Sequence, residues 1–247
     1  MFEMFENDNL FEHRYYMNDN PRQQEILDLL YKKGRVSVSE FSKTLYVSEM
    51  TIRRDLAEME KGGYLKRYRG GAVIKVDFRE MPITERFLVD ANEKKRLSEL
   101  CKPFLRDNMT IYLDSSSTCL YVIPHLVKYK NVTLITNSVK AILNASALHI
   151  PCILIGGDYY EQDMCLVGSL AEDFAKDLNI DVSFMTTAAY SHDGVISDFD
   201  VRQTAMRKII LNNSKHTVFM FEKNKLGKKL TYTLCRSSDE NITVLME

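Results

Sequence analysis

The sequence lacks tryptophan, and its five cysteines are scattered, with no two in a C-x-x-C pair. Paired spacing is what most zinc modules use, so the pattern argues against a zinc module. The histidines also lack metal-ligand spacing, and we expect neither a metal nor a cofactor. An odd number of separated, mostly apolar-flanked cysteines is typical of buried thiols in a reducing cytoplasm. The five are Cys101, Cys119, Cys152, Cys165 and Cys235.

Long apolar runs and chain-breaking residues are also scarce. No run approaches the roughly 18 apolar residues that a membrane span needs. The first 20 residues are acidic and aromatic, unlike a signal peptide. With 10 glycines, 5 prolines and 45% hydrophobic residues, the composition indicates a folded core rather than bulk disorder. We therefore expect a soluble cytoplasmic protein with no membrane partner.

The net charge of −1 hides an uneven distribution. Residues 21–75 carry 12 Lys and Arg against 7 Asp and Glu, whereas residues 1–20 carry 1 against 5 and residues 76–247 carry 20 against 22. Positive charge concentrated in one short segment is what neutralisation of nucleic-acid phosphates requires. A solvated helical face can show the same excess, so charge alone does not decide.

Hydrophobic spacing within the basic segment predicts three short helices. The first covers 22–33, with Pro21 in its first turn and Gly34 as its stop. A short extended piece precedes a second helix at 40–46, for which we expect Ser39 as the cap. Ser48 caps a third helix over 49–63, with Ile52, Leu56 and Met59 on one face. The following "YLKRYRGGAVI" predicts a small β-wing.

The second and third helices would pack on each other as in a helix-turn-helix, which holds the third helix rigid with its first turns in the major groove. The packing residues are Phe41, Leu45, Val47, Ile52 and Leu56. Arg53 and Arg54 are adjacent and so point about 100° apart. At most one can reach base edges, and the other is expected at phosphate. The predicted DNA-binding residues are Ser37, Ser48, Glu49, Met50, Thr51, Arg53, Arg54, Lys66, Arg67 and Arg69. The alternative is a three-helix domain with ordinary surface arginines.

From Asn92 onward, apolar strands alternate with helices, which predicts a mainly parallel sheet covered on both faces. Strands are expected at 110–114, 132–136, 152–157, 182–189, 216–222 and at the end of the chain. Helices are expected at 92–105 (capped by Asn92), 118–129, 138–148, 169–178 and 200–213. The domains are thus a 1–20 extension, a winged helix-turn-helix at 21–75, a linker at 76–91 and an α/β domain at 92–247.

Hydroxyl and glycine residues follow three successive strands of the α/β domain. They are "LDSSSTC" at 113–119, "TNS" at 136–138 and "GG" at 156–157. The carboxyl ends of strands in open α/β sheets bind ligands, and free N–H groups at a helix start suit a phosphate. Helix caps and turns use the same residues, so a structural role remains the alternative.

The segment "VSVSEFSKTLYVSEMTIRRDLAEMEKGGYLKRYRGGAV" resembles the DeoR family of bacterial transcription regulators, and the rest of the chain resembles it less closely. The resemblance implies a regulator, repressor rather than activator, that binds operator DNA. It also implies a C-terminal α/β domain related to sugar-phosphate isomerases that senses a phosphorylated sugar or similar metabolite.

The chain departs from the family pattern in its second half. The loop D-S-G-T-T has Ser116 in place of glycine and Ser117 in place of threonine. Ala188 stands at an acidic position, and an E-x-x-x-K pair becomes Gln203 and Arg207, while Lys225 matches the family lysine. The implied effector residues are Asp114, Ser115, Ser116, Ser117, Thr118, Thr136, Asn137, Ser138, Gly156, Gly157, Gln203, Arg207 and Lys225.

Three functions follow from these observations. The first is an effector-controlled DNA-binding regulator, acting as a dimer or tetramer because one recognition helix contacts few base pairs. The second is a DNA-binding regulator whose α/β domain serves only to oligomerise. The third is an isomerase-type enzyme, which the missing carboxylates disfavour.

Further segments receive structural expectations. Residues 94–96 are expected on a solvated helical face, with approach to an anionic effector as the alternative. We expect "SHDGVISDFD" at 191–200 to form a loop with helix caps, with a cation site as the alternative. Residues 1–20 could form a helix that packs on a partner subunit, or be disordered.

Overall fold

The computed structural model describes residues 20–62, 64–74, 83–87 and 90–246. The chain divides into two compact units, Met1–Ala91 and Asn92–Glu247. The helix considered for residues 1–20 lies outside the described residues, apart from Asn20, as does much of the linker expected at 76–91. Within that linker, the structure has the four-residue helix α4 (Ile83–Arg86).

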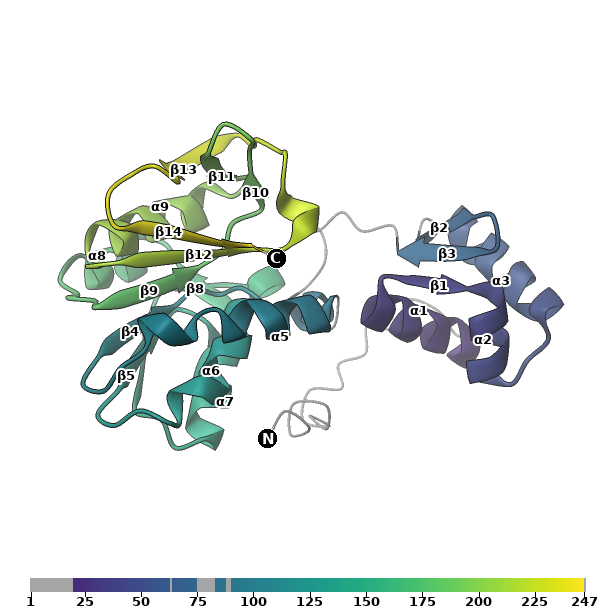
Figure 1. The fold of residues 1–247 in the computed structure, drawn as a ribbon, viewed down its shortest axis with the longest axis horizontal. Helices are drawn as coiled ribbons and strands as arrows, with labels where there is room; N and C mark the ends of the chain where they lie inside the picture. The colour runs from purple at the N-terminus through teal and green to yellow at the C-terminus, as the bar shows by residue number, and fades with distance from the viewer. Residues whose placement is uncertain (1–19, 63, 75–82, 88–89, 247) are drawn as a thin grey trace. The chain divides into compact units, whose positions relative to one another are not determined.

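In the N-terminal unit, the described residues from 20 to 74 form three helices and a three-stranded antiparallel sheet of order β1-β3-β2 (Figure 1). Its main elements are α1 (Pro21–Lys33), β1 (Arg35–Ser37), α2 (Val38–Leu45), α3 (Glu49–Lys61), β2 (Leu65–Tyr68) and β3 (Gly71–Ile74). Strands β2 and β3 form the predicted wing. Gly71 permits the sheet to close, because a Cβ there would lie 2.3 Å from the Val36 carbonyl oxygen.

Each of the three helices has a polar N-cap side chain. Asn20 accepts a hydrogen bond from the Arg22 N–H, and Ser48 accepts one from the Thr51 N–H as expected. The prediction for α2 was wrong. Ser37 is its cap and accepts from the Glu40 N–H, so the helix begins at Val38 and contains Ser39. Ser37 and Glu40 have the S-x-x-E spacing that is typical of a helix start.

The core of this unit is made by one apolar stripe from each helix. As predicted, Phe41, Ile52, Leu56 and Met59 are buried, with Leu45 and Val47 partly buried against them. The remaining buried members are Ile26, Leu27, Leu30, Val36, Val38, Leu65 and Ala72. This packing fixes α3 on α1 and α2. The side of α3 that faces away from the core therefore keeps a defined orientation.

The C-terminal unit is built on a parallel six-stranded sheet of order β14-β12-β9-β4-β5-β6 (Figure 1). The predicted parallel α/β fold is confirmed. Its strands are β4 (Thr110–Leu113), β5 (Thr133–Thr136), β6 (Cys152–Leu154), β9 (Val182–Met185), β12 (Thr217–Phe221) and β14 (Ile242–Met246). Its longer helices are α5 (Ala91–Glu99), α7 (Val139–Ala147), α8 (Ser169–Lys176) and α9 (Val201–Asn212). Strands β9 and β12 are buried along their whole length, and β4 along all but its first residue, because both faces of the sheet are covered.

Two additional pairings were not predicted. Strands β7 (Asp158–Tyr160) and β8 (Cys165–Val167) form a hairpin. Strands β10 (Ala189–Tyr190), β11 (Val195–Asp198) and β13 (Tyr232–Arg236) form a small antiparallel sheet. The expectation of a loop at 191–200 was therefore wrong for β11, although Asp200 does cap α9 by accepting from the Arg202 and Gln203 N–H groups.

Two predicted helices also differ. Asn92 is not a cap, because α5 already includes Ala91. The helix expected at 118–129 is instead a 3-10 turn at Cys119–Val122 followed by α6 (Ile123–Leu126). Pro124 lies at the start of α6 and supplies no N–H, so the chain forms two short turns rather than one long helix.

Candidate functional site

Helix α3 separates its structural residues from its exposed ones. Ile52, Leu56 and Met59 are buried, whereas Met50, Arg53 and Arg54 are exposed. Because residues three and four apart share a helical face, the exposed residues form a surface opposite the core. The helix therefore presents one apolar and two cationic side chains to solvent, and none of these three side chains belongs to the core.

A partly buried ion pair fixes the orientation of α3. Asp55 is buried and accepts two hydrogen bonds from Arg22 of α1, at 2.6 Å from Nε and 3.0 Å from the terminal nitrogen. Asp55 raises the pKa of Arg22, mainly through this hydrogen bonding. Such a two-point contact sets angle as well as distance, so it positions the exposed surface of α3.

The predicted hydroxyl residues of this unit already have partners at helix starts. Ser37 caps α2, and Ser48 caps α3. The hydroxyls of Ser48 and Thr51 also lie 2.9 Å apart. Ser48 is exposed and Thr51 partly exposed, so both can still bind a phosphate through their remaining hydrogen-bonding capacity.

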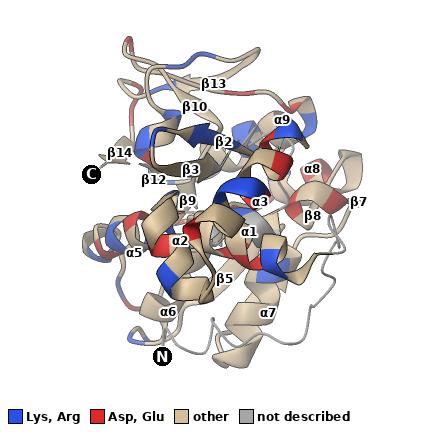
Figure 2. Cartoon of the chain, turned by 90° about the vertical axis from the view of Figure 1, so that its right-hand side faces the viewer, with Lys and Arg blue, Asp and Glu red and all other residues tan. Residues whose placement is uncertain are grey.

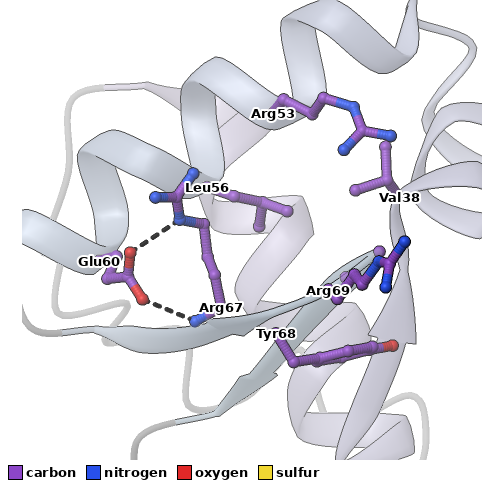
Figure 3. A pocket seen from close by; sticks show the side chains of 9 residues that line it. Val38, Arg53, Leu56, Glu60, Arg67, Tyr68 and Arg69 are labelled. Atoms are coloured by element: carbon purple, nitrogen blue, oxygen red, sulfur yellow. Dashed lines mark hydrogen bonds and ion pairs between the residues drawn. The ribbon is translucent and has the colours of Figure 1, made fainter.

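A hollow between α3 and the wing is lined by three arginines (Figure 3). Arg67 on β2 donates to Glu60 through both its backbone N–H and its Nε, at 2.8 and 2.7 Å. These contacts lower the pKa of the Glu60 carboxyl. Arg53 on α3 and Arg69 beyond β2 extend to the side of the hollow occupied by Val38. Wing and helix thus share one cationic concavity.

The predicted DNA-binding cations differ in whether they form ion pairs within the protein. Arg53 pairs with Glu49 at 3.2 Å, and Arg67 pairs with Glu60. Within the part of the chain that the structure describes, Arg54, Lys66 and Arg69 are exposed and have no hydrogen-bond or ion-pair partner. Figure 2 shows lysines and arginines in blue on α3 and β2.

In the C-terminal unit, the predicted loop at 114–118 lies where the order of the sheet reverses. From β4 the chain continues to β5 and β6 on one side, and later strands β9, β12 and β14 extend the other side. The carboxyl end of β4 is therefore a topological switch point, the usual ligand position in such sheets. The structure brings residues of this loop together with Gln203, Arg207 and Lys225 through the contacts described next.

Arg207 is buried in a cluster of carboxylates. Its Nε donates to Asp114 at 3.0 Å, one terminal nitrogen to Asp198 at 2.7 Å, and the other to Gln203 Oε1 at 2.6 Å. Gln203 in turn donates to Asp163. Burial alone would lower the pKa of Arg207, but Asp114 and Asp198 raise it overall. Its guanidinium is thus committed to internal partners.

A second buried cluster surrounds Glu222, at the end of β12. Its carboxylate accepts a hydrogen bond of 2.6 Å from Thr118 and lies 3.4 Å from Lys94 and 3.6 Å from Lys225. Lys225 also donates to the Thr186 hydroxyl at 3.1 Å. Burial raises the pKa of Glu222, but the two ammonium groups outweigh it, and the pKa is lowered. Two ammonium groups, those of Lys94 and Lys225, thus lie beside the Glu222 carboxylate.

Other predicted residues have structural partners. The Thr136 hydroxyl donates to the Leu113 carbonyl, and Ser138 caps α7. The Asn137 side chain accepts a hydrogen bond from the Tyr112 hydroxyl and donates one to the Leu166 carbonyl. Gly157 has φ of +152°, and a Cβ there would lie 2.5 Å from the Val167 carbonyl oxygen, so β8 requires the glycine. Gly156 is exposed, and a Cβ there would meet no atom within 4 Å.

The hydroxyls of the 114–118 loop are not equivalent. Ser116 accepts from the Cys119 N–H, and Thr118 donates to Glu222. The buried Ser115 hydroxyl has no conventional partner among the described residues, although it lies near enough to the Cys165 thiol to influence its pKa. Ser117 is buried as well, and its hydroxyl has no hydrogen-bond partner among the described residues. The hydroxyls of Ser115 and Ser117 therefore keep hydrogen-bonding capacity that the described protein atoms do not use.

Sequence reasoning missed three members of these clusters. Lys94 was expected on a solvated face, but it is only 1% exposed and ion-paired. Asp198 supplies a carboxylate next to the backbone N–H of Ala188, at 3.3 Å, where the sequence has lost an acid. Glu222 was not considered. An acid directly after the apolar run of β12 was the available signal for Glu222, whereas the partners of Lys94 and Asp198 are distant in sequence.

Among the residues that the structure describes, no helix has the length and apolar character required to cross a bilayer. The same residues contain no group of three or more His, Cys, Asp and Glu side chains placed to hold a metal ion.

Known proteins similar to this chain include several bacterial regulators. A model of the DeoR C terminal sensor domain matches residues 89–245, and a model of the DeoR-like helix-turn-helix domain matches residues 22–77. The HTH-type transcriptional regulator GolR of Listeria innocua is 28% identical, covering 91% of this chain and 89% of GolR. The uncharacterized HTH-type transcriptional regulator YulB of Bacillus subtilis is 31% identical, covering 84% and 81%. The glycerol-3-phosphate regulon repressor of Escherichia coli is 26% identical, covering 86% and 84%.

Among solved structures, a ribose 5-phosphate isomerase from Plasmodium falciparum aligns with a TM-score of 0.42 and 21% identity, covering 56% of this chain and 53% of the isomerase.

Proposed function

We propose, from the premise that this chain belongs to the DeoR family of DNA-binding transcriptional regulators, that it represses genes of sugar or carbohydrate metabolism. In this proposal the N-terminal unit binds operator DNA, and a phosphorylated sugar or related metabolite bound by the C-terminal unit controls that binding. Relatives named as a glycerol-3-phosphate regulon repressor and a lactose phosphotransferase system repressor support the sugar-related assignment. The isomerase alternative loses support because the full-length relatives are regulators.

The observation that carries DNA binding is the exposed cationic surface of α3 and the wing. Arg54, Lys66 and Arg69 are exposed and unpaired among the described residues. The acids of α3 have partners of their own: Asp55 pairs with Arg22, Glu60 with Arg67 and Glu49 with Arg53, and Glu58 accepts a hydrogen bond from Gln23. Uncommitted arginines keep their hydrogen-bond donors for phosphates and guanine edges. The remaining predicted contacts, Ser37, Ser48, Glu49, Met50, Thr51 and Arg53, lie at the starts of α2 and α3.

Substitution of the two adjacent arginines tests DNA binding. Mobility shifts with duplexes selected from a random library by the full chain give the affinity of each variant. We expect Arg54→Ala to cost about 1–3 kcal/mol on the selected sequence and to relax its specificity. Arg53→Ala should weaken all sequences alike and reduce the salt dependence, as expected for a phosphate contact. Unchanged affinity for both variants would refute the proposed surface.

The observation that carries effector binding is the convergence of two ammonium groups and a hydroxyl loop at Glu222. Lys94 and Lys225 lie beside its carboxylate, Thr118 donates to it, and the unused Ser115 hydroxyl belongs to the same loop as Thr118. A phosphate bound beside this cluster would be attracted by the ammonium groups and would accept hydrogen bonds from the loop. The polyol would then extend toward Gln203 and Arg207.

Titration calorimetry tests this assignment with glycerol 3-phosphate, glucose 6-phosphate and ribose 5-phosphate, each beside its unphosphorylated counterpart. A phosphorylated compound should bind and change operator affinity, whereas its counterpart should not. Ser115→Ala combined with Thr118→Ala should abolish the response while DNA binding remains. An effector changes DNA affinity only by the difference in its binding to the two states.

One observation favours a second candidate, in which the C-terminal unit only oligomerises. Arg207 and Gln203 are fully engaged with Asp114, Asp198 and Asp163, so the position expected to contact a sugar is occupied by the protein's own side chains. Absence of heat with all three compounds, together with tight operator binding by a dimer or tetramer, would support this candidate.

A further inference from the structure

Met50 is an exposed apolar residue on an otherwise polar surface. Its side chain is 79% exposed, one of the highest values among the large hydrophobic residues that the structure describes. It does not belong to the apolar core of the N-terminal unit, to which α3 contributes Ile52, Leu56 and Met59. Packing therefore gives no reason for an apolar side chain at this position.

Met50 lies one helical turn before Arg54. Residues four apart share a face, so Met50 and Arg54 lie on one side of α3, and Glu49 and Arg53 on the adjacent side. Met50, Thr51 and Arg54 line a common hollow, whose other lining residues are Asn20, Arg22, Arg53, Asp55 and Glu58. The flexible thioether and the guanidinium thus border the same surface concavity.

The two arginines differ in their freedom to approach a ligand. Arg53 is held by Glu49 and also lines the hollow beside the wing, together with Arg67 and Arg69. Arg54 does not line the wing hollow and has no hydrogen-bond or ion-pair partner among the described residues. Arg53 lines both hollows but is held by Glu49 and shares the wing hollow with the cations suited to phosphate. Arg54 lines only the hollow that contains Met50, and its guanidinium is uncommitted among the described residues.

We propose that Met50 and Arg54 are the specificity-determining pair of this regulator. Arg54 donates two hydrogen bonds to a guanine edge, and Met50 packs against the 5-methyl group of a thymine in the same half-site. This assignment rests on the proposed binding of DNA by α3. Apolar contact with the thymine methyl and bidentate arginine contact with guanine are the pairings that base-edge chemistry favours for these side chains.

The helix geometry limits the distance between the two bases. Residues four apart are separated by roughly 6 Å along a helix axis, and stacked base pairs are separated by about 3.4 Å. The thymine should therefore lie within two base-pair steps of the guanine. Each half-site is expected to contain this guanine–thymine pair.

Removal of a single methyl group tests the proposal. The full chain first selects duplexes from a random library. Each thymine of the selected half-site is then replaced, one at a time, by deoxyuridine, which keeps base pairing and lacks the 5-methyl group. At one thymine near the required guanine, wild-type affinity should fall about three- to fivefold, the loss expected for one buried methyl group.

Two variants assign that loss to Met50. Met50→Ala should bind the thymine and deoxyuridine duplexes with equal, reduced affinity, and Met50→Leu should retain a preference for thymine. Alanine and leucine are good helix formers, and circular dichroism of each variant checks that α3 remains folded. Arg54→Ala should keep the methyl dependence while losing the preference for guanine.

The outcomes separate this inference from the function on which it rests. Selection of a sequence without thymine within two steps of a required guanine would overturn the role of Met50, as would equal binding of every deoxyuridine duplex by wild type. A methyl dependence that persists in Met50→Ala would also overturn it. In all three cases sequence-specific DNA binding itself would stand. Failure to select any sequence would instead refute the proposed operator binding.

Discussion

The two units of this chain use cations in opposite ways. In the N-terminal unit, Arg54, Lys66 and Arg69 are exposed and unpaired among the described residues. In the C-terminal unit, Arg207 is 5% and Lys94 only 1% exposed, and both have carboxylate partners. Exposed cations remain available to a polyanion in solution. Buried ones are available only to a ligand that enters and rearranges their internal contacts, which suits a selective sensor.

The difference also has an energetic side. An exposed surface charge contributes little to folding, whereas removal of one partner from a buried ion pair leaves an uncompensated charge. Substitutions of the same chemical type should therefore have small effects on stability in the first unit and large effects in the second.

The largest expected effect comes from Arg207→Met, which leaves Asp114 and Asp198 buried without their cation. We expect a loss of about 3–5 kcal/mol in the stability of the C-terminal unit. Calorimetry, with hydrogen exchange of the peptides that cover β4 and α9, measures it. The matched control, Arg54→Met, should stay within about 0.5 kcal/mol. Equal effects of the two substitutions on stability would contradict the inferred difference between the buried cations of one unit and the exposed cations of the other.

A smaller effect is expected for Glu222→Gln, which keeps the size of the side chain and an acceptor for Thr118 but removes its charge. The loss at pH 7 should be about 2–3 kcal/mol. Because the pKa of Glu222 is lowered in the folded protein from its ordinary value of 4.5, the charge stabilises the fold above that pH. The difference from wild type should therefore disappear as the pH falls through the lowered pKa. A difference that persists in acid would show that shape rather than charge is responsible.

In the N-terminal unit, the ion pair of Arg22 and Asp55 is partly buried, so its loss should have an effect between those of an exposed and of a fully buried charge. Arg22→Ala leaves the Asp55 carboxylate without its two donors, but solvent can reach the vacated position. We expect a loss of about 1–2 kcal/mol in the stability of this unit, accompanied by weaker DNA binding because α3 loses its orientation. Thermal unfolding and mobility shifts measure the two effects. Weaker DNA binding without any loss of stability would indicate that Arg22 contacts DNA directly.

The smallest predicted effect is a gain. Tyr46 ends α2 with φ of +54° and is 93% exposed, a conformation that is costly for a residue with a Cβ. Tyr46→Gly should relieve about 1–2 kcal/mol of strain and lose part of that to chain entropy, for a net gain of about 0.5 kcal/mol. A small rise in the melting temperature of the N-terminal unit would confirm this, and a fall would show that the tyrosine ring stabilises the turn.

Sequence patterns predicted the elements whose determinants are local. Ser48 with the stripe Ile52, Leu56 and Met59 located α3 to within two residues, because cap and periodicity agree. The start of α2 was misplaced because two candidate cap serines, Ser37 and Ser39, lie only two residues apart before Phe41. Only the Glu40 spacing distinguishes them. Strand β11 was missed because its four residues lie between turn and cap residues, and antiparallel pairing with β13 is not visible in either segment.

The buried clusters of the candidate site could be predicted only in part. The hydroxyl loop at 114–118 and Arg207 were identified, since they follow a strand or match a family position. Lys94 and Glu222 are 128 positions apart in the sequence, and a lysine within a charged helical run has no local feature that indicates burial. The position of Asp198 beside Ala188 likewise depends on how β10 and β11 pair. Long-range partners of this kind are determined by the folded chain.

The separation of buried and exposed residues on α3 has a consequence for divergence and for engineering. Since Ile52, Asp55, Leu56 and Met59 hold the helix, positions 50 and 54 carry no structural task and tolerate exchange. A combinatorial library confined to these two positions should consist almost entirely of folded members, each with its own preferred operator. Gene duplication followed by two substitutions would then give two regulators that no longer compete for the same promoters.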